Sequence, residues 1–158
     1  MKGVLISIRP QWCEKIANGE KTIEVRKSAP QEVPFKCYIY ETQGRTETPW
    51  IDEDGHFIYK GRGQVIGEFI CDKVDTYYYR DFGYEISEET FNKTMLTGVE
   101  FCGYGNGKTL YGWHINDLKI YDKPRELSEF GKVGFGHEVP LKRPCAPWCY
   151  VEDLGEEE

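Results

Sequence analysis

Short stretches of alternating apolar and polar residues, each ended by glycine or proline, recur along this chain of 158 residues. Such alternation is typical of β-strands, and the 17 glycines and 8 prolines favour frequent turns between them. The predicted strands are residues 3–8, 21–27, 35–42, 63–74, 110–121 and 147–151. Helical spacing predicts only short helices, at 11–18 and 87–95, with one more helical turn within 124–130. Because the helices do not alternate with the strands, the sequence predicts a mixed α+β fold that is mainly β: a small β-barrel of five to six strands with two or three short peripheral helices.

The length of the chain fits one hydrophobic core, so we expect a single domain over residues 1–151. Five acidic residues lie within 152–158, and we expect this tail to be solvated and flexible. No apolar run approaches the ~20 residues that span a bilayer, and the first residues lack the pattern of a secretory signal. We therefore expect a cytoplasmic protein with no membrane partner.

The charge of the chain is unevenly distributed. The net charge is −7, but residues 1–63 carry 10 basic and 9 acidic residues, whereas residues 64–158 carry 10 basic and 18 acidic residues. An anionic ligand is therefore expected to bind locally in the amino-terminal half, and a broad basic surface for nucleic acid is excluded.

The six cysteines are expected to be reduced thiols, because no export signal accompanies them. Cys145 and Cys149 form the only closely spaced pair, and a zinc site usually needs a second such pair. The histidines are scattered along the chain. We therefore predict neither a metal nor another cofactor.

The segment Gly19–Arg26 follows the first predicted helix and carries most of the chemical signal. In a strand, Thr22, Glu24 and Arg26 lie on one face, and the last two are about 7 Å apart along the strand. An acid and a guanidinium can meet at that spacing, with Lys21 at the start of the strand. The same pattern also describes an ordinary exposed ion pair.

This segment resembles the signature of the ASCH domain, a member of the PUA-like superfamily. The resemblance rests on the run of residues 7–12, on the helix end at Asn18–Gly19, and on the pattern Gly19-x-Lys21-x-x-Glu24-x-Arg26. Residues 63–71, 113–121 and 147–150 resemble later strands of the domain in its bacterial and prophage members. The resemblance covers nearly the whole chain, with residues 43–62 and 76–108 as insertions.

The resemblance implies a PUA-like β-barrel with a cleft beside the first helix, and RNA or a nucleotide-like small molecule as the ligand. No obligate protein partner is evident. One branch of the family, small amidohydrolases that act on N4-acetylcytidine, shares the lysine at the position of Lys21. That branch has a hydroxyl residue where this chain has Glu24. A carboxylate nucleophile would give an anhydride instead of an ester, so the activity of that branch is not carried over.

Several side chains around this segment are candidate site residues. The candidates for ligand binding are Ser7, Arg9, Trp12, Lys21, Thr22, Glu24, Arg26 and Trp148. If the protein is an enzyme, the catalytic candidates are Lys21, Glu24 and Glu68. Glu68 lies between Ile66 and Ile70 on one strand face, where it is either a partly desolvated proton acceptor with a raised pKa or a solvated residue at the rim. Trp12 suits either stacking on a base or packing in the core, and Trp148 suits either lining a ligand cleft or closing the barrel.

Three hypotheses of function follow. The chain binds RNA or a modified nucleoside, or it is a hydrolase acting on such a ligand, or it is a protein-interaction module that uses an aromatic loop near Trp50 and Phe57. We favour the first because the family resemblance supports it.

Overall fold

The structure is a computed structural model that describes residues 2–43, 61–133 and 139–155. Within these residues the chain forms two compact units. Unit 1 comprises Met1–Glu14, Lys36–Phe69 and Leu118–Glu158, and unit 2 comprises Lys15–Phe35 and Ile70–Asp117. The helix α1 (Pro10–Ala17) spans the division. The single domain predicted over residues 1–151 stays a prediction.

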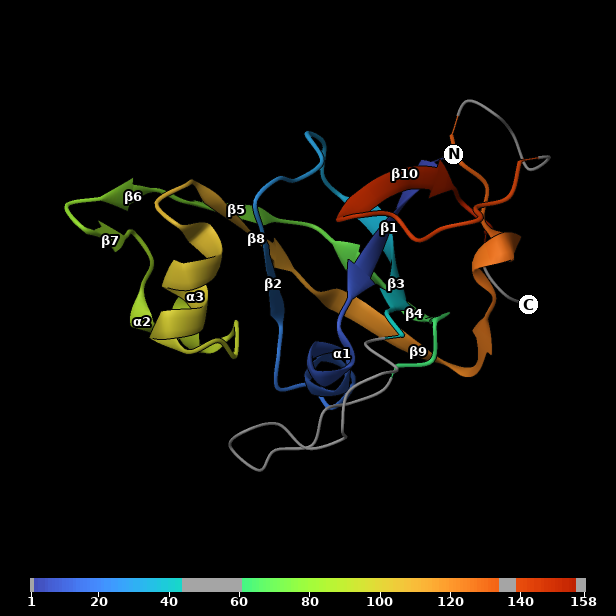
Figure 1. Cartoon of the computed structure of the whole chain (residues 1–158), viewed down its shortest axis with the longest axis horizontal. Helices are drawn as coiled ribbons and strands as arrows, with labels where there is room; N and C mark the ends of the chain where they lie inside the picture. Colours follow the sequence, from blue (N-terminus) through green and yellow to red (C-terminus); the bar gives the residue numbers. More distant parts are fainter. Residues whose placement is uncertain (1, 44–60, 134–138, 156–158) are drawn as a thin grey trace. The chain divides into compact units, whose positions relative to one another are not determined.

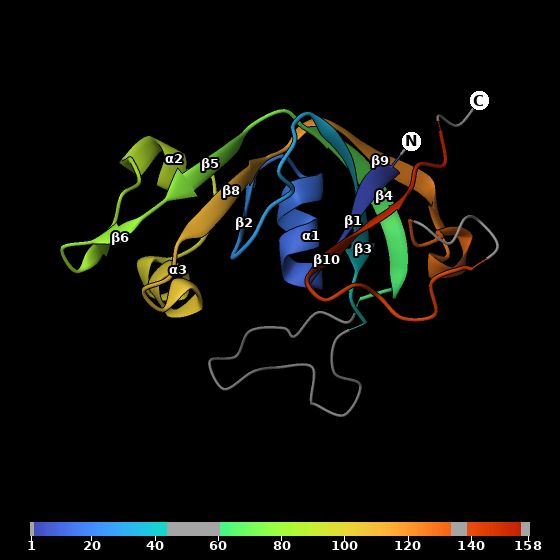
Figure 2. The ribbon, with the colours of Figure 1, turned by 90° about the horizontal axis from the view of Figure 1, so that it is seen from above.

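Unit 1 is built on a five-stranded sheet with the strand order β10-β1-β3-β4-β9 (Figure 2). The strands are β1 (Lys2–Ile8), β3 (Phe35–Glu41), β4 (Gln64–Cys71), β9 (Asn116–Arg125) and β10 (Trp148–Glu152). β1 runs parallel to β3 and antiparallel to β10. The parallel pair brings residues 2–8 beside residues 35–41, and the last strand of the chain lies at the free side of the first.

The core of unit 1 collects aromatic and aliphatic side chains from most of these strands. Leu5, Tyr38, Val65, Tyr121 and Phe130 belong to one buried cluster, and the ring of Tyr38 meets that of Phe130 edge to face at 4.8 Å. The short 3-10 helix η1 (Leu127–Glu129) leads into Phe130. Both faces of β1 are buried, because adjacent residues from Val4 to Ile6 are all covered.

Gly67 interrupts the apolar run of β4, and a glycine inside a strand predicts a bulge or a close backbone approach. A Cβ atom at this position would lie 2.5 Å from the carbonyl oxygen of Lys119 on β9. The close approach is therefore confirmed, because the absence of a side chain lets the two strands meet.

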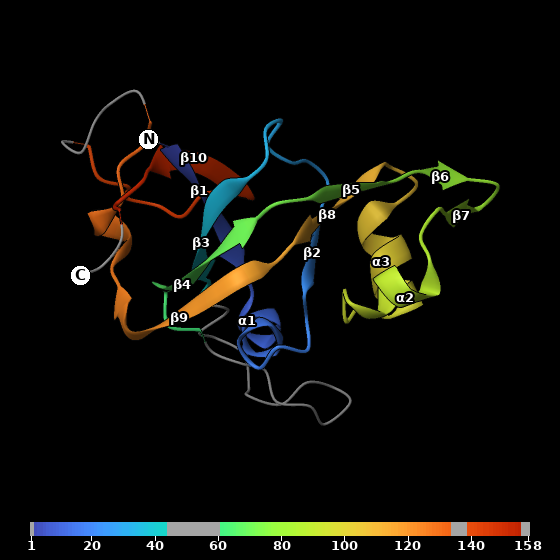
Figure 3. The same cartoon turned by 180° about the vertical axis from the view of Figure 1, so that it is seen from behind.

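Unit 2 is built on a three-stranded antiparallel sheet with the strand order β2-β8-β5 (Figure 1). Its strands are β2 (Ile23–Arg26), β5 (Val74–Tyr77) and β8 (Leu110–His114). A two-stranded hairpin and two helices complete the unit: β6 (Tyr79–Arg80), β7 (Gly83–Tyr84), α2 (Glu88–Asn92) and α3 (Gly98–Gly105). Figure 3 shows α2 and α3 beside this hairpin.

Both helices of unit 2 begin at a hydroxyl cap. The side chain of Ser87 accepts a hydrogen bond from the backbone N–H of Thr90, as the predicted helix start requires. Thr97 and Glu100 form a capping box at the start of α3. Phe101 of α3 then packs on Ile23 and Val25 of β2, and this contact gives unit 2 a core of its own.

The prediction of a mainly β, mixed α+β fold is confirmed, with three α-helices among the described residues. The segments 63–74 and 110–121 were each predicted as one strand, but each divides between two strands, because β4 and β9 pair in the unit 1 sheet whereas β5 and β8 pair in the unit 2 sheet. The described strands pair into three sheets, and their closure into a barrel stays a prediction. Trp50, Phe57 and most of the predicted insertion at 43–62 lie outside the described residues.

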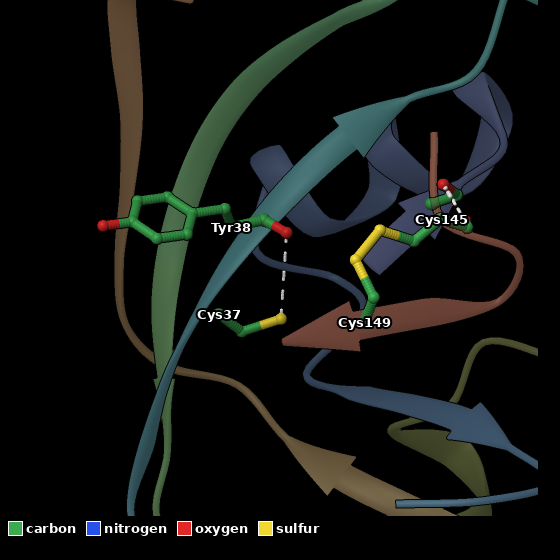
Figure 4. The surroundings of a disulfide bond; sticks show 5 residues. Cys37, Tyr38, Cys145 and Cys149 are labelled. Atoms are coloured by element: carbon green, nitrogen blue, oxygen red, sulfur yellow. Dashed lines mark hydrogen bonds between the residues drawn. A yellow bond between two sulfur atoms is a disulfide. The ribbon is translucent and has the colours of Figure 1, made fainter. Parts of the chain in front are cut away.

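The expectation of reduced thiols is wrong for one pair, because a disulfide joins Cys145 to Cys149 (Figure 4). The turn between them brings their Cα atoms to 5.6 Å, which is within the range that a disulfide spans. Cys13, Cys37 and Cys71 are free and buried. The Sγ of Cys37 lies 3.8 Å from the carbonyl oxygen of Tyr38.

No helix among the described residues is long and apolar enough to cross a membrane.

Candidate functional site

Lys21 is held in unit 2 by the turn that connects α1 to β2. Gly19 has a φ of +86°, a backbone conformation that favours glycine and ends the helix. The backbone N–H of Lys21 then donates to the carbonyl oxygen of Lys15 at 2.9 Å. The side chain runs inward, with only 2% of the residue exposed, and its Nζ donates to the carbonyl oxygen of Thr94. A lysine buried to this degree is rare in folded proteins.

The burial of Lys21 changes its chemistry. Desolvation lowers the pKa of its ammonium group, and the positive charge of Arg26 lowers it further. The carboxylates of Glu24 and Glu100 act in the opposite direction, but the net pKa remains below the usual value. Lys21 is therefore more easily deprotonated than a surface lysine.

Glu24 and Arg26 form an ion pair on β2. The Nε of Arg26 lies 3.3 Å from Oε1 of Glu24, and the two side chains are 12% and 8% exposed, respectively. The other carboxylate oxygen, Oε2 of Glu24, is buried and has no hydrogen-bond partner among the described residues. A buried acceptor without a partner costs free energy, so a donor that reached this oxygen would stabilise it.

The strand register places two aromatic residues on the sheet face that carries this ion pair. Glu24 pairs with Trp113 of β8, and Arg26 pairs with Tyr111. Paired residues of an antiparallel sheet project to the same side. Trp113 is buried, donates from Nε1 to the carbonyl oxygen of Ser28 at 3.2 Å, and meets the ring of Phe35 edge to face. Ile23 and Val25 project to the opposite face and pack in the core of unit 2.

The helix α3 adds two residues that the sequence reasoning missed. Burial raises the pKa of Tyr104, and the nearby charges of Arg26 and Glu24 act on it in opposite directions. The Nζ of Lys27 lies 4.8 Å from the centre of the Tyr104 ring. Glu100 acts on Lys21 from the same helix. The capping-box pattern of Thr97 and Glu100 was the sequence signal for this helix, but three glycines within 98–105 hid it.

Comparison with solved structures gives three neighbours at probability 1.00, all of them forms of the ASCH protein of Zymomonas mobilis. A serine-to-alanine variant has a TM-score of 0.65 and 16% identity, over 95% of this chain and 88% of that chain. A tyrosine-to-phenylalanine variant has a TM-score of 0.57 and 18% identity, over 80% and 77%. The unsubstituted protein has a TM-score of 0.56 and 18% identity, over 79% and 73%.

The chain has the ASCH-domain fold. No family model and no curated protein matches the sequence. At 16–18% identity the structural likeness shows the fold and assigns no role to individual residues.

Within this ASCH fold, the predicted trio of Lys21, Glu24 and Arg26 lies together in unit 2. Thr22 lies beside them, where its backbone N–H donates to the carbonyl oxygen of Lys93 at 3.0 Å and its own carbonyl oxygen accepts from Ile115. The charges of the trio therefore act on one another, whereas their arrangement around a ligand and their roles stay predictions.

The remaining predicted residues belong to unit 1. The hydroxyl of Ser7 donates to the carbonyl oxygen of Cys145 at 2.6 Å, so it also fastens the turn before β10. Trp148 packs edge to face on Tyr150, with ring centres 5.4 Å apart. Arg9 is exposed, and Trp12 is half-buried.

Glu68, the third catalytic candidate, also belongs to unit 1. Its Oε2 lies 3.0 Å from the Nζ of Lys36, and its Oε1 accepts a hydrogen bond from the hydroxyl of Tyr121 at 2.9 Å. The carboxylate thus has protein partners on both oxygens. Among the described residues, no three histidine, cysteine or acidic side chains lie close enough together to hold a metal ion.

Proposed function

We propose that this protein binds RNA or a modified nucleoside through the cluster of Lys21, Glu24 and Arg26. The ASCH fold supports the proposal, since the sequence resemblance to that family implies RNA or nucleotide-like ligands. The single observation that carries it is the buried carboxylate oxygen of Glu24 that has no hydrogen-bond partner among the described residues.

The chemistry of Glu24 defines the part of the ligand that it would contact. A carboxylate only accepts hydrogen bonds, so its ligand partner must be a donor. Among base edges, the exocyclic amine of cytosine is the donor that Glu or Asp accepts from. Arg26, which holds the other carboxylate oxygen, brings a guanidinium that suits phosphate. The proposed ligand is therefore an amine-bearing base with a phosphate nearby.

Cytidine and uridine provide a matched pair for the test, because they differ by an amine against a carbonyl at one ring position. Titration calorimetry with each nucleoside should show tighter binding of cytidine to the wild-type protein. Glu24→Gln should reduce that preference, since a neutral amide can also donate to a carbonyl. We expect a change of about tenfold or more in the ratio of the two affinities.

Two further variants make the result interpretable. Arg26→Ala should weaken binding of RNA oligonucleotides more than binding of nucleosides, because the phosphate contact is lost. Glu88→Gln changes an exposed acid of the same unit and should leave both affinities unchanged. Equal binding of cytidine and uridine by the wild-type protein, or an unchanged ratio in Glu24→Gln, contradicts the proposal.

A second candidate function is a hydrolase that acts on a modified nucleoside or on RNA. The specific observation in its favour is the lowered pKa of Lys21, because a buried amine that loses its proton can serve as a general base. Glu24 would then accept or return the proton. This hypothesis leaves Glu68 without a role in the step.

Mass spectrometry of a panel of modified nucleosides, incubated with the protein, tests this second function. Turnover should rise with pH as Lys21 deprotonates, and it should be lost in Lys21→Met. An absence of turnover by the wild-type protein rejects the hydrolase, and so does full turnover by both Lys21→Met and Glu24→Ala.

A further inference from the structure

A hollow of about 390 Å³ lies in unit 2, and the site described so far does not use it. Its walls come from the segment after β2 and from strands β5 and β8. The lining residues are Lys27, Ser28, Ala29, Pro30, Gln31, Val74, Thr76 and Tyr111. Its volume is within the range of pockets that hold small organic ligands.

The strand register connects this hollow to the Glu24–Arg26 pair. Arg26 pairs with Tyr111 on β8, and Tyr111 pairs in turn with Thr76 on β5. Adjacent strands are about 4.8 Å apart, so the hollow begins one strand away from Arg26 on the same face of the sheet. With a separation of about one strand spacing, one ligand can reach both Arg26 and the hollow.

The walls of the hollow combine three kinds of chemistry. Tyr111 supplies an aromatic ring, while Ala29, Pro30 and Val74 supply apolar surface. Hydroxyl and amide groups also line it, from Ser28, Thr76 and Gln31. Such walls suit a planar heterocycle with polar edges, because a base can stack on the ring while its edge forms hydrogen bonds.

The charge of the residues that line the hollow narrows the class of ligand that it can bind. In a chain of net charge −7, the lining includes Lys27 and no acidic residue. A cationic ligand would find no counter-charge there, whereas a phosphate would find the neighbouring guanidinium of Arg26. Acidic peptides share the negative charge but lack the planar ring that the aromatic wall would stack on.

We infer that this hollow binds the base of a second nucleotide, adjacent in an RNA strand to the one whose base donates to Glu24. The inference rests on the proposed function and narrows its ligand from a single nucleoside to an RNA of at least two nucleotides. The phosphate between the two nucleotides lies at Arg26, between Glu24 and the hollow. Tyr111 is the stacking platform for the second base.

Calorimetric titrations with cytidine, with cytidine monophosphate and with the dinucleotides CpU and UpC test this inference. We expect at least one dinucleotide to bind the wild-type protein about tenfold more tightly than the monophosphate, a gain in keeping with one stacked base. Tyr111→Leu removes the ring, and Ala29→Phe fills the hollow from the loop. Both variants should abolish the gain while leaving cytidine binding unchanged.

Tyr78→Leu is the matched control, since Tyr78 is 46% exposed and does not line the hollow. It should keep the full gain. Equal affinities for monophosphate and dinucleotides, or a full gain in both Tyr111→Leu and Ala29→Phe, overturns the second subsite and leaves the first intact. An unchanged ratio of the cytidine and uridine affinities in Glu24→Gln overturns the proposed function instead, and an absence of nucleoside binding by the wild-type protein overturns both.

Discussion

Each unit of the molecule places a lysine near acidic side chains, half-buried Lys36 in unit 1 and buried Lys21 in unit 2, and the pKa values of the two lysines shift in opposite directions. In unit 1, burial alone would lower the pKa of Lys36, but its hydrogen bond to Glu68 and the charge of Asp153 raise it overall. In unit 2, desolvation prevails and the pKa of Lys21 is lowered. The difference lies in the balance of burial and charge, because Lys36 is half-buried and pairs with two carboxylates, whereas the desolvation of buried Lys21 outweighs the charges of Glu24 and Glu100.

The acids around the two lysines differ in the same way. Glu68 bonds to Lys36 and Tyr121, and Asp153 bonds to Lys36 and to the hydroxyl of Tyr38 at 2.6 Å. Asp153 also accepts a hydrogen bond from the backbone N–H of Gly155. Glu24 keeps one oxygen without a hydrogen-bond partner among the described residues. In unit 1 both oxygens of Glu68 have hydrogen-bond or ion-pair partners, whereas in unit 2 one oxygen of Glu24 has no hydrogen-bond partner among the described residues. An acid with such an unsatisfied oxygen is the better indicator of a ligand site.

The largest expected effect is that of Arg26→Ala on stability. The change removes the guanidinium that pairs with the carboxylate of Glu24, which is only 8% exposed, and breaking a buried ion pair costs about 3 kcal/mol or more. Urea unfolding followed by circular dichroism measures this loss. Lys36→Ala should cost less, because Glu68 and Asp153 keep their tyrosine donors. Equal losses in the two variants contradict the comparison between the units.

A smaller effect is expected for Tyr38→Phe in unit 1. The hydroxyl of Tyr38 donates to Asp153 and accepts from the backbone N–H of Leu154, and burial together with Asp153 raises its pKa to about 12. Loss of a hydrogen bond to a charged group should lower the free energy of unfolding by about 1.5 kcal/mol.

Tyr78→Phe is a suitable control for this measurement, because its ring is 46% exposed in unit 2. Its stability should equal that of the wild-type protein. If Tyr38→Phe also leaves the free energy of unfolding unchanged, the hydrogen bonds of Tyr38 to Asp153 and Leu154 do not stabilise unit 1.

The difference between the units also explains how far the sequence could predict the molecule. The alternation within residues 2–8 and 35–41 and the stop at Gly19 depend on local chemistry, so the strands and the first helix were predicted closely. The contact between Glu24 and Arg26 was predictable for the same reason, since they are two residues apart on one strand, whereas the site around them stays a prediction.

Contacts between distant segments were not predictable in this way. Glu68 was proposed as a proton acceptor because its aliphatic neighbours suggested desolvation, but its partners Lys36 and Tyr121 come from other strands. Tyr104 and Glu100 act on the trio from α3, a helix that its glycines concealed. The Cys145–Cys149 disulfide was missed because the lack of an export signal suggested reduced thiols. In the structure the turn brings the two Cα atoms to 5.6 Å, close enough for a disulfide.

The sharpest test of the comparison is the pH dependence of stability. A buried lysine with a lowered pKa binds fewer protons in the folded than in the unfolded protein, where the pKa is about 10.4. The free-energy cost of burying its charge is therefore present at neutral pH and decreases as the pH rises toward about 10.4. The wild-type protein should gain stability relative to Lys21→Met when the pH is raised from 7 to 10, as measured by urea unfolding.

Lys36→Met should show no such trend over this interval. The pKa of Lys36 is raised in the folded protein, so its contribution is fully present below about 10.4 and is lost only at more alkaline pH. Tyrosine ionisation is common to both comparisons and cancels in each difference. If the difference between wild type and Lys21→Met is the same at pH 7 and pH 10, Lys21 has an ordinary pKa, and the cluster of unit 2 is as saturated as that of unit 1.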